Sequence, residues 1–142
     1  MKIQKIRNVK TPSRGTLQSA GIDFYIPEDF KEKVLQPGES ILIPSGIKVQ
    51  VPTGYMLTAF NKSGVATKNG LSVGACVVDE DYEGEIHLHL INTSNFNALI
   101  EPGKKIVQFI LIPVNYEEVE IVEELQCRNT LRGSGGFGST GV

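Results

Sequence analysis

The sequence predicts an all-β protein, a β-sandwich or jelly roll formed as a single domain. Apolar and polar residues alternate along short segments: Ile86, Leu88 and Leu90, for example, are separated by His87 and His89. Such alternation places the apolar side chains on one face of a half-buried strand. Turns containing Pro and Gly separate the segments, and helical periodicity is scarce. A chain of 142 residues has the length of one ordinary domain.

The individual elements follow from the same pattern in chain order. The expected strands are Ser40–Pro44, Ile47–Val51, Glu85–Leu90, Val107–Val114 and a last one over Val119–Leu125. The expected turns are Pro37-Gly38, Pro44-Ser45-Gly46, Pro52-Thr53-Gly54, Lys68-Asn69-Gly70 and Glu101-Pro102-Gly103. The one helical candidate is about a turn over Gly64–Lys68. This spacing of strands and turns suits a sandwich or jelly roll.

Composition and charge narrow the classes of protein. The net charge is −2 and no basic block occurs, which argues against a general nucleic-acid binder because such proteins need Lys and Arg on the phosphates. No apolar run is long enough to span a bilayer, and the first ten residues lack the apolar core of a signal peptide. We therefore expect no membrane association and a cytoplasmic location, in the host cytoplasm if a phage encodes the protein. Cys76 and Cys127 show no metal-binding spacing, so we expect reduced thiols.

The last eleven residues, 132–142, differ from the rest of the chain. Their glycine content is too high to bury much surface, and composition alone is typical of a disordered tail. Arg132 and Phe137 point to a function, because an Arg fork suits phosphate and a Phe ring can cover a flat base. Glycines also let backbone N–H groups approach an anion closely. We expect a core over residues 1–131 followed by a mobile lid over residues 132–142.

Five motifs resemble, in order, those of the trimeric deoxyuridine triphosphatase (dUTPase) family and cover nearly the whole chain. They are Ala20–Tyr25, Asn61–Ala66, Gly74–Glu85, Gly103–Phe109 and Arg132–Gly141. The resemblance implies the dUTPase-like β-clip fold and a dUTP diphosphatase, which hydrolyses dUTP to dUMP and pyrophosphate with Mg²⁺. That reaction would lower dUTP and supply dUMP for thymidylate synthesis.

The third motif carries Asp79 and Asp81 around a turn that precedes Tyr82. Spacing alone favours a hairpin with solvated acidic side chains. The resemblance implies that Asp79 orients and activates the attacking water, a task suited to a carboxylate that is anionic at neutral pH. It also implies that Tyr82 packs against the deoxyribose, where a 2′-hydroxyl would clash. The backbone groups expected to pair with the uracil edge are those of Cys76, Val77 and Val78.

The second motif implies a phosphate contact by the Ser63 hydroxyl, near the bond that breaks, with Lys62 and Gly64 beside it. Without the resemblance, a Ser-Gly turn is an ordinary helix start. The family commonly has Arg where this chain has Lys62, so the positive charge is kept while the bidentate fork is lost. Two further departures, Cys76 in place of Gly and Glu83 in place of Arg or Gln, remove no catalytic group.

The first and fourth motifs each contribute one polar side chain. Asp23 could cap a turn, whereas the resemblance implies that it supports Mg²⁺ through bound water, consistent with the sparse protein ligation of this ion. Gln108 lies in an apolar run, so its amide must find a partner. That partner is either a backbone group or, as the resemblance implies, a substrate phosphate.

The fifth motif supplies the lid. The resemblance implies that Arg132 stabilises the departing pyrophosphate, as one of four catalytic residues together with Asp79, Gln108 and Ser63. The lid residues expected to bind substrate are Arg132, Phe137, Gly138 and Ser139. The resemblance also implies a homotrimer with three sites at subunit interfaces, in which the tail of one subunit closes a site built by the other two.

Two other functions stay open at this point. One is a dCTP deaminase of the same fold, which would need an acid/base group near C4 of cytosine. The other is a regulatory protein that binds a partner in a nucleotide-dependent manner. His87 and His89 are not predicted to bind a metal, because no pattern for a third ligand accompanies them.

Overall fold

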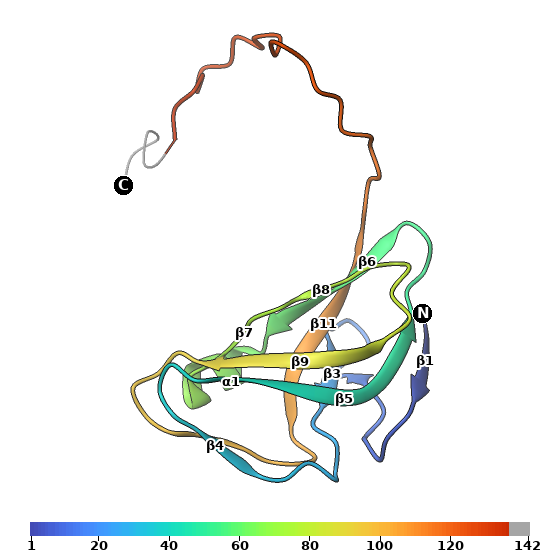
Figure 1. Cartoon of the computed structure of the whole chain (residues 1–142), viewed down its shortest axis with the longest axis vertical. Coiled ribbons are helices and arrows are strands. Elements are labelled where there is room, and N and C mark those ends of the chain that lie inside the picture. Colours follow the sequence, from blue (N-terminus) through green and yellow to red (C-terminus); the bar gives the residue numbers. More distant parts are fainter. Residues whose placement is uncertain (137–142) are drawn as a thin grey trace.

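The computed structural model describes residues 1–136 and confirms an all-β architecture, with every strand pair antiparallel. The first sheet has the order β1 (Lys2–Lys5), β5 (Ser40–Gln50), β9 (Glu85–Asn92) and β7 (Leu71–Val73) (Figure 1). The second has the order β2 (Ser13–Arg14), β3 (Ile22–Tyr25), β11 (Lys105–Pro113), β6 (Tyr55–Asn61) and β8 (Val77–Val78). A small third sheet pairs β10 (Ala98–Ile100) with β4 (Lys33–Leu35).

A single apolar core holds the sheets together. It includes the predicted inward face of β9, where Ile86, Leu88 and Leu90 are buried, as alternation along the strand requires. From the second sheet, the rings of Phe24 and Phe109 contribute a tilted pair with centroids 4.5 Å apart. The core therefore holds β11 in the middle of the second sheet, which carries most of the predicted site residues.

One predicted turn is wrong. Pro44-Ser45-Gly46 does not end a strand; it is an irregularity within the eleven-residue β5, where the register against β9 shifts between Pro44 and Lys48. Gly46 adopts a φ of 74°, which favours glycine, and its N–H is bonded to the Glu85 side chain. A bulge has the same local composition as a turn, and only the strand pairing on both sides distinguishes them.

The expected helical turn is present as α1 (Ser63–Asn69), which begins directly after β6. Gly70 follows it in the left-handed conformation and ends it. The helix therefore holds the second motif at the end of β6 in the second sheet, and it packs beside β7.

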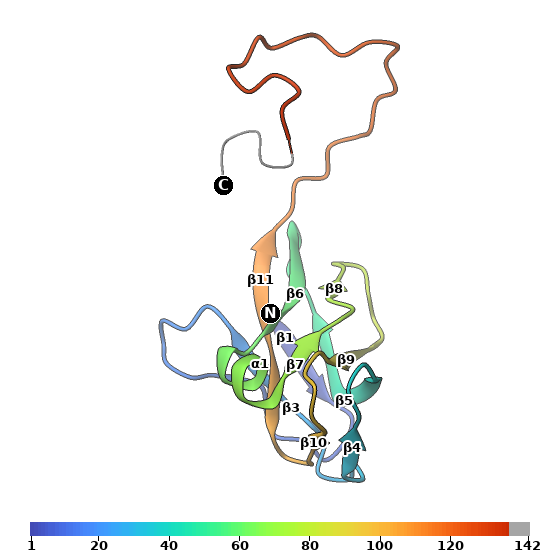
Figure 2. The same cartoon turned by 90° about the vertical axis from the view of Figure 1, so that its left-hand side faces the viewer.

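The chain from Val114 onward forms a C-terminal arm, defined here as residues 114–136, that leaves the end of β11 and curves away from the sheets (Figures 1 and 2). The strand predicted over Val119–Leu125 is wrong for the single chain, because this segment contains no strand. Val119, Ile121 and Leu125 are almost fully exposed. A strand needs a partner for its backbone N–H and C=O groups, and among the described residues none pairs with this segment. The boundary expected at 131/132 falls inside this arm.

Other expectations concern the surface. Cys76 and Cys127 are not joined in a disulfide, as predicted, and both residues are exposed. Among the described residues, no helix combines the length and apolar character needed to cross a membrane.

Candidate active site

The third motif forms one half of the candidate site. The strand β8 pairs with β6, so that Val78 lies opposite Leu57 and Val77 opposite Thr58. A pocket of about 260 Å³ opens beside this strand. Its wall includes the residues predicted to bind uracil and deoxyribose, together with parts of β9 and β11: Cys76, Val77, Val78, Asp79, Tyr82, Ile86, His87 and Phe109. The volume is near the lower limit of ligand pockets, a size suited to a base and sugar.

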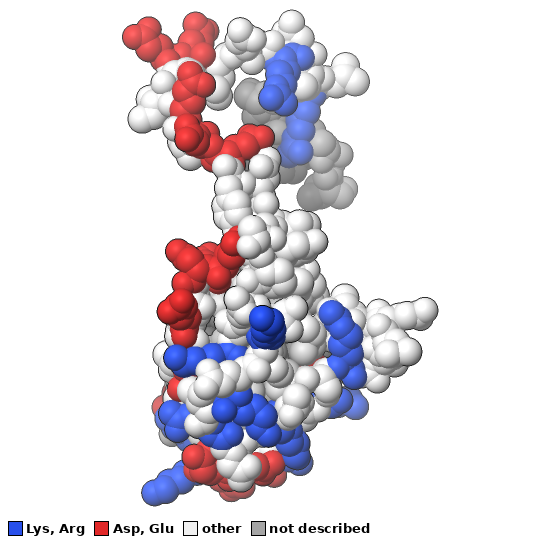
Figure 3. All heavy atoms as spheres, turned by 90° about the vertical axis from the view of Figure 1, so that its right-hand side faces the viewer, with Lys and Arg blue, Asp and Glu red and all other residues white. Residues whose placement is uncertain are grey.

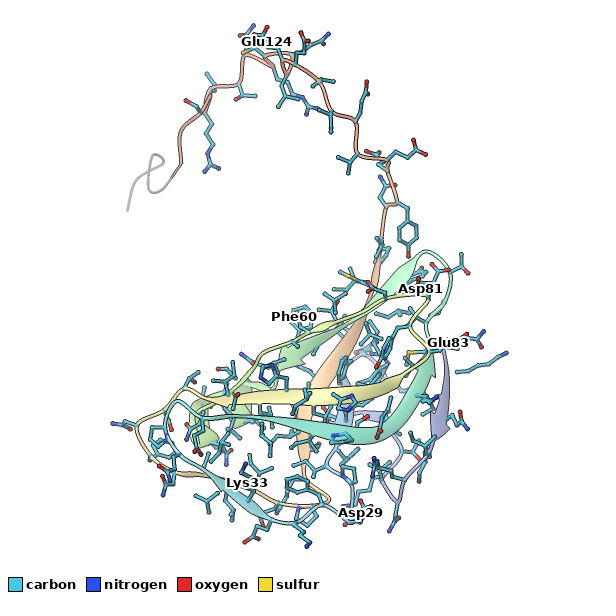
Figure 4. All side chains as sticks on the ribbon, in the orientation of Figure 1. Asp29, Lys33, Phe60, Asp81, Glu83 and Glu124 are labelled. Atoms are coloured by element: carbon cyan, nitrogen blue, oxygen red, sulfur yellow. The ribbon has the colours of Figure 1, made fainter. Side chains whose placement is uncertain are left out.

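Asp79 and Tyr82 both line this pocket at its exposed edge. This is the place expected for a carboxylate that activates water and for a ring that contacts the sugar. Asp79 is exposed, and its carbonyl accepts a hydrogen bond from Tyr82 N–H at 3.3 Å, which closes the turn. The Tyr82 hydroxyl donates to the Glu85 carbonyl at 2.9 Å, so the ring folds over Gly84. A Cβ at Gly84 would lie 2.2 Å from that hydroxyl, which explains the glycine of the motif. Asp81 and Glu83 point outward from the same loop (Figure 4).

The two histidines support the pocket from β9 in different ways. His89 Nδ1 accepts a hydrogen bond from Ala75 N–H at 2.8 Å, which fixes the chain just before Cys76. Gly74 makes this approach possible, because a Cβ there would lie 2.1 Å from His89 Nδ1. His87 is 2.9 Å from the Glu85 carbonyl and lines the pocket. The described residues contain no cluster of three metal-ligating side chains, so the two histidines belong to none.

Glu85 anchors the far end of the same hairpin. Its carboxylate accepts hydrogen bonds from Arg7 Nε at 2.9 Å and from Gly46 N–H at 2.7 Å. Burial by itself would raise the pKa of the Glu85 carboxyl, but the bonds from Arg7 and Gly46 outweigh it and hold the pKa below its ordinary value. The same bond raises the pKa of the Arg7 guanidinium. The sequence pattern did not predict this ion pair, because Arg7 and Glu85 are 78 positions apart in the sequence.

The first, second and fourth motifs form the other half of the site. Asp23 is 5% exposed, and its two oxygens face two different ammonium groups: Lys62 bonds to Oδ1, and Lys105 lies 3.2 Å from Oδ2. A buried carboxylate requires such pairing. Lys105 was missed by the sequence analysis, although it lies within the fourth motif and β11 brings it next to β3.

Gln108 lies directly opposite Asp23 in the β11–β3 register. Its side-chain amide donates to the Asn61 carbonyl at 2.8 Å, the backbone partner that was one of the two alternatives. A Cβ at Gly21 would lie 2.1 Å from Gln108 Oε1, so the glycine of the first motif makes room for this side chain. Gln108 is thereby held at the surface of the sheet between the first and second motifs.

Within one chain the candidate phosphate ligands lie away from Asp79. The strand β8, which leads into Asp79, pairs with Leu57, and Lys62 lies five positions further along the chain than Leu57, or roughly 17 Å at about 3.4 Å per residue. Ser63 and Gly64 begin α1 and are exposed beside Lys62. Arg132 is exposed on the arm, where its Nε donates to the Gly135 carbonyl. Phe137, Gly138 and Ser139 lie outside the described residues.

The donors beside Asp23 can be tested against the expected Mg²⁺. Both oxygens of Asp23 already face lysines, and the described chain offers no set of three ligands. Such an arrangement fits an ion held by substrate phosphates and water, with Asp23 acting through water, and does not fit a dedicated protein site.

A larger groove of about 600 Å³ lies on the other side of Tyr82, between that loop and the strands β1 and β5. Of the residues expected to bind substrate, only Tyr82 lines this groove, whereas Cys76, Val77, Val78, Asp79 and Tyr82 all line the β8 pocket. We therefore place the candidate site at the β8 pocket.

Fold and site together define a class: all-β proteins with a small pocket, an exposed carboxylate on its wall and a separate ion-pair cluster of Asp23, Lys62 and Lys105. Comparison with known proteins gives the family. The dUTPase family model matches residues 7–141, and the chain belongs to the dUTPase family.

Individual relatives match this chain over most of their length. The chain is 39% identical to the deoxyuridine 5′-triphosphate nucleotidohydrolase of Yarrowia lipolytica, covering 95% of this chain and 84% of that protein. It is 42% identical to the enzyme of the same name from Maricaulis maris, covering 92% and 87%. Among solved structures, the G164S mutant dUTPase of Staphylococcus bacteriophage 80alpha, with dUpNHpp, superposes with a TM-score of 0.88 at 25% identity, covering 99% of this chain and 98% of that one.

Proposed function

We propose that this protein hydrolyses dUTP to dUMP and pyrophosphate by attack of water on the α-phosphorus. The observation that carries the proposal is the exposed Asp79 at the mouth of a pocket walled by β8 and Tyr82. Its relatives in Yarrowia lipolytica and Maricaulis maris bear the name of this activity. A carboxylate at that position can accept the proton of a water molecule held between it and a bound nucleotide.

Base selection follows from the backbone of β8. The pairing of Val77 and Val78 with β6 leaves an edge of the strand toward the pocket, and N–H and C=O groups there can bond to the edge of a pyrimidine. A narrow pocket would reject the 5-methyl group of thymine, and the ring of Tyr82 would reject a 2′-hydroxyl. Cys76 adds a side chain to this wall, which makes it a candidate for tuning base selection.

Phosphate binding falls to the second half of the site. Lys62 and Lys105 provide positive charge, and Ser63 and Gln108 provide a hydroxyl and an amide that can contact oxygens. When bound to the triphosphate, Mg²⁺ would supply charge neutralisation. The task of these side chains is positioning and electrostatic stabilisation, which dominate phosphoryl transfer.

We further propose that the active assembly is a homotrimer and that each site combines three chains. The argument is geometric. Within one chain Lys62 lies roughly 17 Å along β6 from the point where β8 leads into Asp79. The arm also leaves its apolar residues Val119, Ile121 and Leu125 exposed. A neighbouring chain can join the β8 pocket to a Lys62–Gln108 cluster, and a third chain can deliver Arg132. Closed rotational symmetry then repeats the site three times.

The test is pyrophosphate release in the presence of Mg²⁺ from dUTP, dTTP, dCTP and UTP, with ammonia release from dCTP measured in parallel. We expect hydrolysis of dUTP with strong preference over the other three nucleotides. Equal rates on all four would contradict the proposal, and ammonia release would point to a deaminase. Sedimentation at several concentrations measures the assembly, and a monomer at assay concentrations would contradict the trimer.

A further inference from the structure

Glu80 lies between Asp79 and Asp81, yet its side chain bonds to two segments outside the pocket. The oxygen Oε2 accepts a hydrogen bond from Gly54 N–H at 2.8 Å. The same oxygen accepts one from the Tyr116 hydroxyl at 2.9 Å. Gly54 lies in the turn between β5 and β6, and Tyr116 lies at the start of the C-terminal arm. One carboxylate therefore joins the catalytic turn, a second turn and the arm.

The Gly54 peptide is also held from its other side. Its carbonyl accepts a hydrogen bond from Val114 N–H at 2.9 Å, two residues before Tyr116. Gly54 adopts a φ of 81°, a conformation that favours glycine. The turn at Gly54 is thus bonded both to Glu80 and to the first residue of the arm. Because Tyr116 of the arm is also bonded to Glu80, the three segments form a closed ring of hydrogen bonds.

The ionisation states suit this arrangement. The bonds from Gly54 N–H and then from Tyr116 hold the pKa of the Glu80 carboxyl below its ordinary value. The pKa of the Tyr116 hydroxyl is raised, first by its hydrogen bond to Glu80 and also by the charges of Asp79 and Asp81. At neutral pH a carboxylate therefore accepts from a protonated hydroxyl, and hydrogen bonds to a charged acceptor are stronger than those between neutral groups. Acidic side chains are gathered on the body just below the arm (Figure 3).

We propose that Glu80 and Tyr116 form a positioning pair that ties the Asp79–Tyr82 turn to the base of the C-terminal arm. Glu80 directly follows Asp79, so the restraint on its side chain limits the movement of the Asp79 carboxylate. The same restraint sets the direction in which the arm leaves β11. Placement of the water-activating group and placement of the arm are thereby coupled. The consequence for catalysis rests on the proposed function, whereas the coupling itself is structural.

The kinetic test compares Glu80→Ala, Glu80→Gln and Tyr116→Phe in the full-length protein, with Glu83→Ala as the control on the same loop. We expect Glu80→Ala and Tyr116→Phe to lower kcat for dUTP on the order of tenfold with little change in KM, because misplacement of a catalytic group affects the reaction step. Glu80→Gln should recover most of kcat, since an amide oxygen can still accept both bonds. Glu83→Ala should behave as the wild type.

The double variant Glu80→Ala/Tyr116→Phe tests whether the two residues act as a pair. Because either change breaks the bond, we expect the double variant to lose no more kcat than Glu80→Ala alone. Multiplied losses would overturn the pairing, and so would a kcat for Glu80→Ala no lower than that of Glu83→Ala.

Hydrogen exchange followed by mass spectrometry gives a readout that does not depend on turnover. In Tyr116→Phe, peptides covering residues 79–84 should exchange faster, while peptides from the β9 residues 88–92 should not change. Unchanged exchange over 79–84 would overturn the coupling. If the wild-type protein failed to hydrolyse dUTP, the proposed function would fall, and the exchange result would still decide the coupling. Faster exchange with an unaltered kcat would overturn the catalytic role of the pair.

Discussion

Asp23 and Gln108 lie directly opposite each other on β3 and β11, and each is bonded to the segment where β6 ends: Asp23 through Lys62, and Gln108 through the Asn61 carbonyl. Three of the five motifs thus meet at one end of the second sheet. The ion pair between the buried Asp23 and the partly buried Lys62 holds this end of the sheet in place.

Asp79→Asn should abolish most turnover while leaving nucleotide binding in place. The amide keeps the size of the side chain and loses the basic oxygen, so we expect kcat for dUTP to fall by roughly 10²–10⁴-fold. Pyrophosphate release gives kcat, and titration calorimetry with dUpNHpp gives binding. Turnover within a few fold of the wild type would show that another group activates the water.

Mixed trimers test the proposed exchange of arms. Chains carrying Asp79→Asn and chains ending after Leu131 should each be nearly inactive alone. If both are unfolded together and refolded at equal concentration, about a quarter of the sites should combine an intact Asp79 with an intact arm from another chain. Recovery of activity on mixing checks this. An inactive mixture that still contains trimers would mean that the arm serves the site of its own chain.

Asp23→Asn should destabilise the protein and weaken phosphate binding. Removing the carboxylate leaves the partly buried Lys62 without its partner, and we expect a loss of roughly 1–3 kcal/mol in the free energy of unfolding. Urea unfolding measures the loss. Glu101→Gln, which breaks an exposed pair with Lys104, serves as the control and should change stability by less than about 0.5 kcal/mol.

Glu85 should make stability sensitive to acid. Its pKa in the folded chain is below the ordinary value of 4.5, so its stabilising effect is complete above about pH 4.5 and is lost as the pH falls through the folded pKa. Glu85→Gln should therefore lower the urea midpoint at pH 7 and show a shallower decline between about pH 5 and 3. Parallel curves for the two proteins over this range would contradict the assignment.

Cys76 offers a chemical probe of the pocket. Its thiol is exposed on the pocket wall, whereas Cys127 is exposed on the arm. We expect dUpNHpp to slow alkylation of Cys76 by at least about tenfold by covering it, and mass spectrometry of the digested protein distinguishes the two thiols. Cys76→Ser provides the control for Cys127 alone. If saturating nucleotide slowed alkylation of neither Cys76 nor Cys127, the uracil base would have to bind elsewhere.

Local signals in the sequence predicted the β class, and the motifs named most residues of the candidate site. Alternation along Glu85–Leu90 predicted β9 with its buried face, and the Ser-Gly turn predicted α1, because both signals are local. The motifs named Asp79, Tyr82 and Gln108 through resemblance. Local composition misidentified the bulge at Gly46 as a turn, since glycine with positive φ serves both.

Which of these side chains contact one another depends on the tertiary structure. Lys105 joins Asp23 because β11 pairs with β3, and Glu80 joins Tyr116 because the arm begins beside the β5–β6 turn. Neither pairing has a local signature, since strand register depends on partners far along the chain. The same reason explains why Val119–Leu125 has the pattern of a strand without forming one in a single chain. Its alternation is a local signal, whereas a strand also needs a pairing partner, and none of the described residues pairs with this segment.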